Sequence, residues 1–302
     1  MNQDWKDAIK HLRLHFSLLL MPVFLFAVSQ VSNSPYEQSF FINPLNLLIT
    51  FIVLHLLVYP ASNAFNSYYD KDIGSVGGLK NPPPINQKML WVANTLDLAA
   101  LALSYIISIP FTLLVIVYIS ASRLYSYRPI RLKKYPILGF LVIFIFQGAF
   151  TFNLSLYGLL PKSGCLGPFA PEIFSSKLVW ARLACSFQIG AIYPLTQIYQ
   201  HKSDLEDGVT TLSYKLGYKG TFIFSGAMFS IATLFYFLHF KEVNLNTFYI
   251  LLAAQTPIIS YFLYWARLVW QNTNNANYKN TMRMNIIAAT ILNLFFLYLV
   301  IY

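Results

Sequence analysis

Nine apolar segments of about 20 residues each divide this chain of 302 residues. A helix needs about 20 apolar residues to cross the hydrocarbon core of a bilayer. Only 11% of the residues are charged and the mean hydropathy is +0.53, whereas about a quarter of the residues are charged in soluble domains. No long polar segment remains, so residues 1–302 are predicted to form a single membrane-embedded, all-α domain. Its predicted transmembrane helices are roughly 14–32, 44–68, 89–108, 110–126, 136–159, 178–199, 220–240, 247–268 and 284–302.

The positions of lysine and arginine orient these helices. Most of these basic residues lie in the N-terminal segment or in the loops after the even-numbered segments. In a chain of consecutive spans, all of these parts face the same side of the membrane. The opposite side holds Lys162, Lys177 and Lys241, with Arg182 just inside the sixth segment. The positive-inside rule therefore predicts a multi-pass protein of the cell membrane with a cytoplasmic N-terminus and an outer C-terminus. The net charge of +10 follows from this bias, so it gives no reason to expect a nucleic-acid partner.

The second apolar segment ends in a cluster of amide and acidic side chains, Asn63-Ala-Phe-Asn66-Ser-Tyr-Tyr-Asp70-Lys-Asp72. At 100° per residue, Asn63, Asn66 and Asp70 fall on one stripe of a helix. Polar and ionisable side chains at the end of a membrane span predict a functional site.

A second cluster of the same chemistry closes the sixth apolar segment. Its members recur at spacings of three and four residues, as expected for one helical stripe: Tyr193, Gln197, Gln200, Asp204 and Asp207, with Glu206 beside the last. Both clusters lie on the predicted cytoplasmic side.

Oxygen-rich clusters of this kind are typical of a magnesium site. Mg²⁺ takes a few carboxylate or amide oxygens and completes its octahedron with phosphate oxygens and water. The two clusters therefore predict Mg²⁺ and a polyanionic substrate such as a diphosphate. The candidate metal ligands are Asn66, Asp70, Asp72, Asp204, Glu206 and Asp207, and Gln200 is a further neutral oxygen donor. Basic residues on the same side can neutralise a leaving diphosphate: Lys80, Arg128, Arg131 and Lys133.

Each of these residues also has a purely structural explanation. Asn63, Asn66 and Gln197 can hydrogen-bond neighbouring helices, and acids in short loops are usually solvated. The basic run from Arg128 to Lys134 can contact anionic lipid headgroups. Asp97, about eight residues into the third segment, is a functional candidate by its position in the membrane, and the sequence names no partner for it.

Nine spans with acidic motifs after the second and sixth resemble the UbiA superfamily of intramembrane prenyltransferases. The first motif of that family reads Asn-Asp-x-x-Asp-x-x-x-Asp. Asn66 and Asp70 match it, whereas Gly74 stands at its last aspartate. The second motif has two aspartates four residues apart; Asp204 matches the second, and Gln200 stands at the first.

Two further stretches support the resemblance. The segments Gly208–Leu212 and Leu216–Gly217 are similar to the sequence that follows the family's second motif. The segments Tyr125–Pro129 and Arg131–Lys133 are similar to its tyrosine and basic residues after the fourth span. The resemblance covers essentially the whole chain.

The resemblance implies a bundle of nine helices around a central cavity and Mg²⁺-dependent transfer of an isoprenyl chain. The donor would be an allylic isoprenyl diphosphate, and the acceptor an aromatic or lipophilic molecule in the membrane. It implies catalytic roles for Asp70, Asp204, Lys80 and Arg128. It also implies substrate contacts for Asn63, Asn66, Gln197, Gln200, Tyr127, Arg131 and Lys133. The missing carboxylates at Gly74 and Gln200 weaken the metal site unless Asp72 compensates in the first motif and Glu206 or Asp207 in the second.

A second interpretation is a non-catalytic protein, either a lipid-binding protein or a carrier built on the same fold. Transporters also place polar groups on broken helices, but usually near the bilayer midplane. The position of both clusters at the cytoplasmic rim favours the enzyme.

Overall fold

A computed structural model describes residues 2–32, 43–71, 74–160 and 176–302, and they are almost entirely helical. Within these ranges no strand forms beyond an isolated antiparallel bridge between Val76 and Leu79. Eight helices are long and apolar enough to cross a membrane, and a ninth is counted if the bent pair Gln3–Leu19 and Met21–Ser32 forms one span. The predicted all-α, polytopic membrane architecture is confirmed.

The chain divides into two compact units. The first contains Met1–Leu132 and Asn153–Pro168, and the second contains Lys133–Phe152 and Phe169–Tyr302. The expectation of a single domain over residues 1–302, and of one central cavity, stays a prediction.

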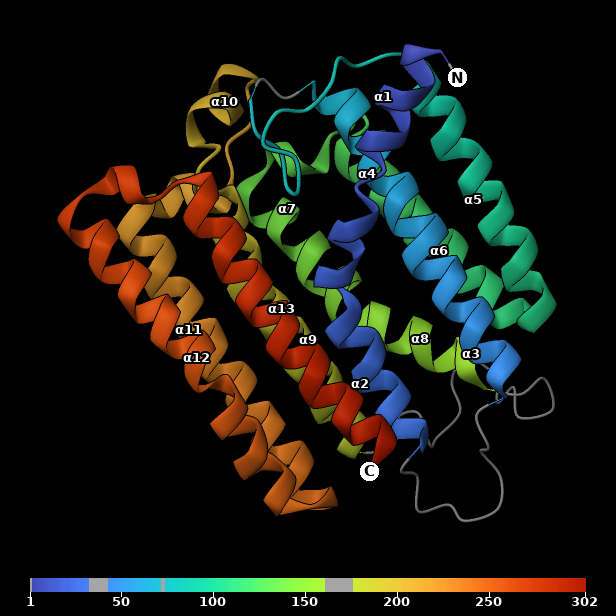
Figure 1. Ribbon diagram of the computed structural model, residues 1–302, viewed down its shortest axis with the longest axis vertical. Coiled ribbons are helices and arrows are strands. Elements are labelled where there is room, and N and C mark those ends of the chain that lie inside the picture. The colour runs from blue at the N-terminus through green and yellow to red at the C-terminus, as the bar shows by residue number, and fades with distance from the viewer. Residues whose placement is uncertain (1, 33–42, 72–73, 161–175) are drawn as a thin grey trace. The chain divides into compact units, whose positions relative to one another are not determined.

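The first unit is built mainly from the helices before residue 127 (Figure 1). They are α1 (Gln3–His11), η1 (Leu14–Leu19), α2 (Met21–Ser32), α3 (Pro44–Phe51), η2 (Ile52–Val58), α4 (Tyr59–Asp70), α5 (Lys88–Ile107) and α6 (Ile109–Ser126). Together α3, η2 and α4 form one membrane-length helix, Pro44–Asp70. Its C-terminal part, α4, packs against both α5 and α6.

The first apolar segment is not one straight helix. The chain bends by 50° between η1 and α2, where Pro22 occupies the first turn of α2. Proline is tolerated there because the first N–H groups of a helix have no partner within it. Before the bend, Arg13 adopts a left-handed conformation with φ of 47°, which separates the amphipathic α1 from the apolar residues that follow.

The boundary between α5 and α6 is a single residue. Ser108 is extended, and its hydroxyl accepts a hydrogen bond from the backbone N–H of Phe111 at 3.2 Å. A serine cap followed by Pro110 in the first turn is a strong start signal for a helix. The two helices therefore form a tight antiparallel hairpin in the first unit.

The second unit holds the remaining long helices. They are α7 (Pro136–Ile143), η4 (Phe144–Phe150), α9 (Ser176–Gln197), α10 (His201–Glu206), α11 (Leu212–Val243), α12 (Leu245–Gln271), η7 (Thr273–Asn275) and α13 (Tyr278–Ile301). The turn η3 (Leu132–Lys134) and α8 (Thr151–Leu159) lie where the chain passes between the units. Neighbouring helices along the chain pack together, α9 on α11, α11 on α12 and α12 on α13 (Figure 1).

The helix α11 begins about two turns before the predicted span. Thr211 caps it by accepting a hydrogen bond from the N–H of Tyr214, and the axis breaks at Gly217, where φ is 68°. Only glycine adopts this backbone conformation without strain. The first turn of α11 is thus a separate polar segment, and the apolar part follows the break.

Candidate active site

The first predicted cluster lies on one continuous helix, as its spacing indicated. The helix α4 carries Asn63, Asn66 and Asp70 and ends at Asp70, because Lys71 turns left-handed with φ of 52°. Asp70 is only 7% exposed. A buried carboxylate is costly unless charged or polar groups surround it.

Two arginines surround the end of α4. Arg128 donates from Nε to the carbonyl oxygen of Tyr69 at 2.7 Å and from a terminal nitrogen to that of Asp70 at 3.4 Å. A terminal nitrogen of Arg131 lies 3.9 Å from Oδ1 of Asp70. The ring of Tyr127 lies 5.4 Å from that of Tyr69. The structure therefore brings three residues of the loop after α6 to the first acidic cluster.

The two asparagines of this cluster have different surroundings. Asn63 donates from Nδ2 to the carbonyl oxygen of Leu12 at 3.1 Å, and its own carbonyl accepts from Arg13 at 3.1 Å. Its side chain thus ties the N-terminal segment to α4. By contrast, Oδ1 of Asn66 is buried and has no hydrogen-bond partner among the described residues. Asn66 is the better placed of the two to contact a ligand.

Lys80 lies on a small loop that the N-terminal segment holds in place. The loop closes through two backbone hydrogen bonds of 2.9 Å between Val76 and Leu79. Arg13 donates to the carbonyl oxygen of Gly77 at 3.0 Å, and a ring nitrogen of His11 lies 2.9 Å from that of Pro83. Asp72, the predicted replacement for the missing aspartate, lies outside the described residues.

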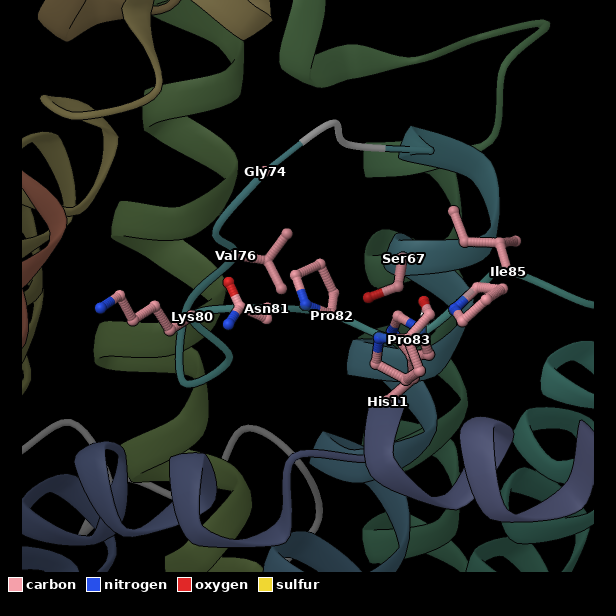
Figure 2. Close-up of a pocket in the computed structure, with 10 residues that line it drawn as sticks. His11, Ser67, Gly74, Val76, Lys80, Asn81, Pro82, Pro83 and Ile85 are labelled. Carbon is pink, nitrogen blue, oxygen red and sulfur yellow. Dashed lines mark hydrogen bonds between the residues drawn. The ribbon is translucent and has the colours of Figure 1, made fainter. Parts of the chain in front are cut away.

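A cavity of about 460 Å³ separates this loop from α4 (Figure 2). Ser67 and His11 lie on one side of it, and Lys80 and Asn81 lie on the other. Gly74, at the position of the last family aspartate, also lines it. In Figure 2 the Lys80 side chain extends away from Ser67. Lys80 therefore lines the same cavity as Ser67 of α4, but its side chain points away from that helix (Figure 2).

In the second unit the predicted single stripe is broken, which corrects the expectation from spacing. The helix α9 ends at Gln197, and Asp204 lies on the separate six-residue helix α10. Gln200 precedes α10 with φ of −101° and ψ of 0°, outside helical geometry. Pro194 near the end of α9 has no N–H for the helical ladder, which weakens the last turn.

Only one of the three acids in the second cluster is buried. Asp204 is 8% exposed, whereas Glu206 is exposed and Asp207 is half-buried. The backbone carbonyl of Asp204 accepts from the N–H of Val209 at 2.8 Å, which closes the turn through Gly208. Gln197 donates from Nε2 to the hydroxyl of Tyr193 at 2.8 Å, and its buried Oε1 has no partner among the described residues. Lys133 lies in η3, at the start of this unit.

His201 anchors α10, a role that was not predicted from the sequence. Its Nε2 lies 2.8 Å from the hydroxyl of Ser213, and its ring stacks on that of Tyr218 with centroids 4.9 Å apart. Burial lowers the pKa of His201 from 6.5 to about 4, so the ring is neutral at pH 7. The position of His201 between Gln200 and Asp204 was the feature of the sequence that could have indicated a role near the second cluster.

The intramembrane acid Asp97 has a partner that the sequence did not reveal. Arg123 of α6 donates to Asp97 of α5 in an ion pair within the first unit. The guanidinium of Arg123 also lies over the ring of Phe65, 4.0 Å from its centroid. Because α5 and α6 form a tight hairpin at Ser108, the two residues lie at depths about one helical turn apart.

The carboxylate and amide oxygens of the two clusters are of the kind that binds Mg²⁺, but each cluster supplies only a few of them. No group of three or more His, Cys, Asp or Glu side chains converges within the part of the chain that the structure describes. Each acidic cluster instead offers one buried carboxylate, Asp70 or Asp204, and Asn66 adds an amide oxygen with no partner among the described residues. Taken by itself, each cluster suits a Mg²⁺ ion most of whose ligands are phosphate oxygens and water, as is usual for this metal.

Comparison with known protein families gives a clear result. The model of the UbiA prenyltransferase family matches residues 19–287, so this chain belongs to that family. The members of the family are prenyltransferases, which makes this protein an enzyme of the prenyltransferase class. A comparison with curated protein sequences finds no match.

Solved structures share the fold at low sequence identity. A UbiA homolog from Archaeoglobus fulgidus bound to DMAPP and Mg²⁺ matches with a TM-score of 0.63 and 16% identity, over 96% of this chain and 99% of that one. An apo UbiA homolog from Aeropyrum pernix K1 matches with a TM-score of 0.67 and 16% identity, over 96% and 98%. A digeranylgeranylglyceryl phosphate synthase matches with a TM-score of 0.59 and 19% identity, over 99% of both chains.

Proposed function

We propose that this protein transfers an isoprenyl group from an allylic isoprenyl diphosphate to a lipophilic acceptor within the membrane, in a Mg²⁺-dependent reaction. The observation that carries the proposal is the end of α4. There the buried carboxylate of Asp70 lies beside Arg131. One turn earlier lies Oδ1 of Asn66, which has no partner within the described part of the chain. Membership of the UbiA family supports the class of reaction, and relatives have been solved with DMAPP or GPP and Mg²⁺.

Each residue has a defined part in this proposal. Asp70 with Asn66, and Asp204, would contribute ligands to Mg²⁺, which when bound withdraws negative charge from the diphosphate oxygens. Arg128 and Arg131 supply positive charge, and the contacts of Arg128 with the last carbonyls of α4 hold it in place. Preorganised charge of this kind stabilises a leaving diphosphate without reorganisation.

The transfer follows from these roles. The allylic carbon–oxygen bond breaks and its electron pair leaves with the diphosphate. The acceptor then forms a bond to the allylic carbon and releases a proton. Helices that exclude water protect the cationic carbon from hydrolysis.

The finer assignments belong to the same proposal. The N-terminus is cytoplasmic and the C-terminus outside, which places both clusters where soluble diphosphates are available. Lys134, which is exposed, faces the anionic headgroups of membrane lipids. The acceptor enters from the membrane, as a lipophilic molecule would.

The test uses the purified full-length protein with DMAPP, GPP and longer allylic diphosphates, with Mg²⁺ and with EDTA. Membrane extract supplies the acceptor, and mass spectrometry identifies prenylated products. We expect products only with Mg²⁺. Asp70→Asn and Asp204→Asn should each lower turnover at least about tenfold, equivalent to ~1.4 kcal/mol.

The matched control is Asp4→Asn, which removes one carboxylate from the exposed face of α1 and should leave turnover unchanged. Equal losses in all three variants would contradict the site assignment. Diphosphate binding that is indifferent to Mg²⁺, with no product for any donor, would favour the non-catalytic lipid-binding protein instead.

A further inference from the structure

A second cavity, of about 470 Å³, lies inside the second unit among α9, α11, α12 and α13. This volume falls within the range of small-molecule sites, roughly 300–1,000 Å³. Its walls are mostly apolar and include Phe229 and Phe262, and none of the lining residues is charged. The cavity therefore suits a neutral, apolar molecule of moderate size.

One hydroxyl in this cavity lacks the partner that its neighbours have. On α11, Ser230 donates to the carbonyl oxygen of Gly226 at 3.0 Å, and Thr233 donates to that of Phe229 at 3.0 Å. Ser225 is 1% exposed, and its Oγ has no hydrogen-bond partner among the described residues. A buried hydroxyl without a partner is unfavourable, because its hydration has been lost without replacement.

A second donor faces the same cavity from α9. Gln188, which is 3% exposed, accepts a hydrogen bond at Oε1 from the hydroxyl of the buried Tyr236 at 2.5 Å. This contact, which uses the amide oxygen, is the one hydrogen bond of the Gln188 side chain within the described part of the chain. The contact with Tyr236 fixes the orientation of the amide, so that its N–H groups remain available as donors.

From this arrangement we infer that the cavity binds a neutral, lipophilic ring compound that carries carbonyl oxygens. The hydroxyl of Ser225 and the amide of Gln188 both supply donors, which selects a ligand with acceptors. The rings of Phe229 and Phe262 favour a flat ring, since aromatic pairs attract beyond simple burial. The absence of charge among the lining residues excludes a diphosphate here. This site is independent of the proposed prenyl transfer, because it involves neither acidic cluster.

The experiment measures ligand binding rather than turnover. The full-length protein in neutral detergent micelles is dialysed to equilibrium with a dimethylated naphthoquinone, with empty micelles as the blank. The matching dimethylnaphthalene has the same rings but no carbonyl oxygens. We expect saturable binding of the quinone, and binding of the naphthalene about five- to tenfold weaker.

Three variants locate the site. Ser225→Ala removes the unpartnered hydroxyl and should weaken quinone binding about five- to tenfold. Ser230→Ala, on the same helix, removes a hydroxyl that is already bonded and should leave binding unchanged. Gly226→Leu should abolish binding by filling the cavity, because a side chain there points at the ring of Phe262, 3.7 Å from the Cβ position.

Thermal unfolding checks that each variant is folded. If Gly226→Leu does not fold, the comparison of Ser225→Ala with Ser230→Ala still decides. Equal affinity for the quinone and the naphthalene would overturn the inference, and so would equal affinities of the two serine variants. Loss of prenyl transfer in a variant that still binds the quinone would bear on the proposed function alone.

Discussion

Arg123 lies on a membrane-length helix and is largely buried, and two neighbouring groups stabilise its positive charge. The carboxylate of Asp97 pairs with it, and the face of the Phe65 ring lies 4.0 Å from its guanidinium carbon. Phe65 is one turn before Tyr69, whose carbonyl oxygen accepts from Arg128. The ion pair thus lies beneath the end of α4 that carries Asp70.

Removing only one member of this pair should destabilise the protein strongly. Arg123→Met leaves the carboxylate of Asp97 buried without its partner, which costs about 3 kcal/mol. The double variant Asp97→Leu with Arg123→Met replaces both charges with apolar groups and should recover most of that loss. Thermal unfolding in detergent micelles measures both. A double variant no more stable than Arg123→Met would contradict this account.

A substitution at Gln200 tests whether the second acidic cluster carries enough negative charge to bind Mg²⁺. It stands where the family has an aspartate, so Gln200→Asp restores one negative charge near Asp204. If the site is short of charge, Mg²⁺ should bind more tightly and Asp207→Asn should have little effect. If Asp207 already compensates, the added carboxylate crowds like charges, and both variants should lose activity. Titration of the wild type and both variants with Mg²⁺ distinguishes a site that is short of charge from one that Asp207 compensates. If none of the three proteins depends on Mg²⁺, the prenyltransferase mechanism is contradicted.

At the scale of elements, the stability of α10 and its surroundings depends on the neutral form of the His201 imidazole. In the unfolded chain this imidazole titrates near 6.5, whereas burial lowers its folded pKa to about 4. The unfolded state therefore binds more protons between these values. Stability that is present above pH 6.5 is lost as the pH falls towards 4.

The prediction is that the wild type loses more thermal stability between pH 7 and pH 4 than His201→Gln does. An amide at this position can still hydrogen-bond the hydroxyl of Ser213 but does not titrate. Melting temperatures of both proteins across this range provide the measurement. Parallel curves would show that His201 does not control the acid sensitivity.

At the scale of the whole molecule, the topology predicts which ends are accessible from each side. Lys134 and Lys241 are both exposed lysines on opposite predicted sides. With both natural cysteines replaced by serine, a membrane-impermeant thiol reagent should label Lys134→Cys only from the cytoplasmic side and Lys241→Cys only from outside. Reversed labelling would invert the orientation and place the acidic clusters away from cytosolic diphosphates.

Much of the architecture could be predicted because the thickness of the bilayer sets the length of each apolar segment, which can be read from the local sequence. A span needs about 20 apolar residues, so α5, α6 and the helix Pro136–Leu159 begin and end within a residue or so of the predicted positions. The stripe of Asn63, Asn66 and Asp70 was also predictable, since it lies on one unbroken helix. The second stripe was not, because Gln200 leaves helical geometry and separates Asp204 from α9.

The sequence by itself determined the class of protein, the membrane spans and the residue types that gather at the end of α4. Tertiary structure alone decided which of those side chains have other partners. It gave Asn63 the carbonyl of Leu12, Asp97 the guanidinium of Arg123 and Ser225 no partner in the described residues. The physical reason is that periodicity reports which face of a helix a residue occupies. A hydrogen bond or ion pair depends on what a different helix, distant in the chain, places opposite that face.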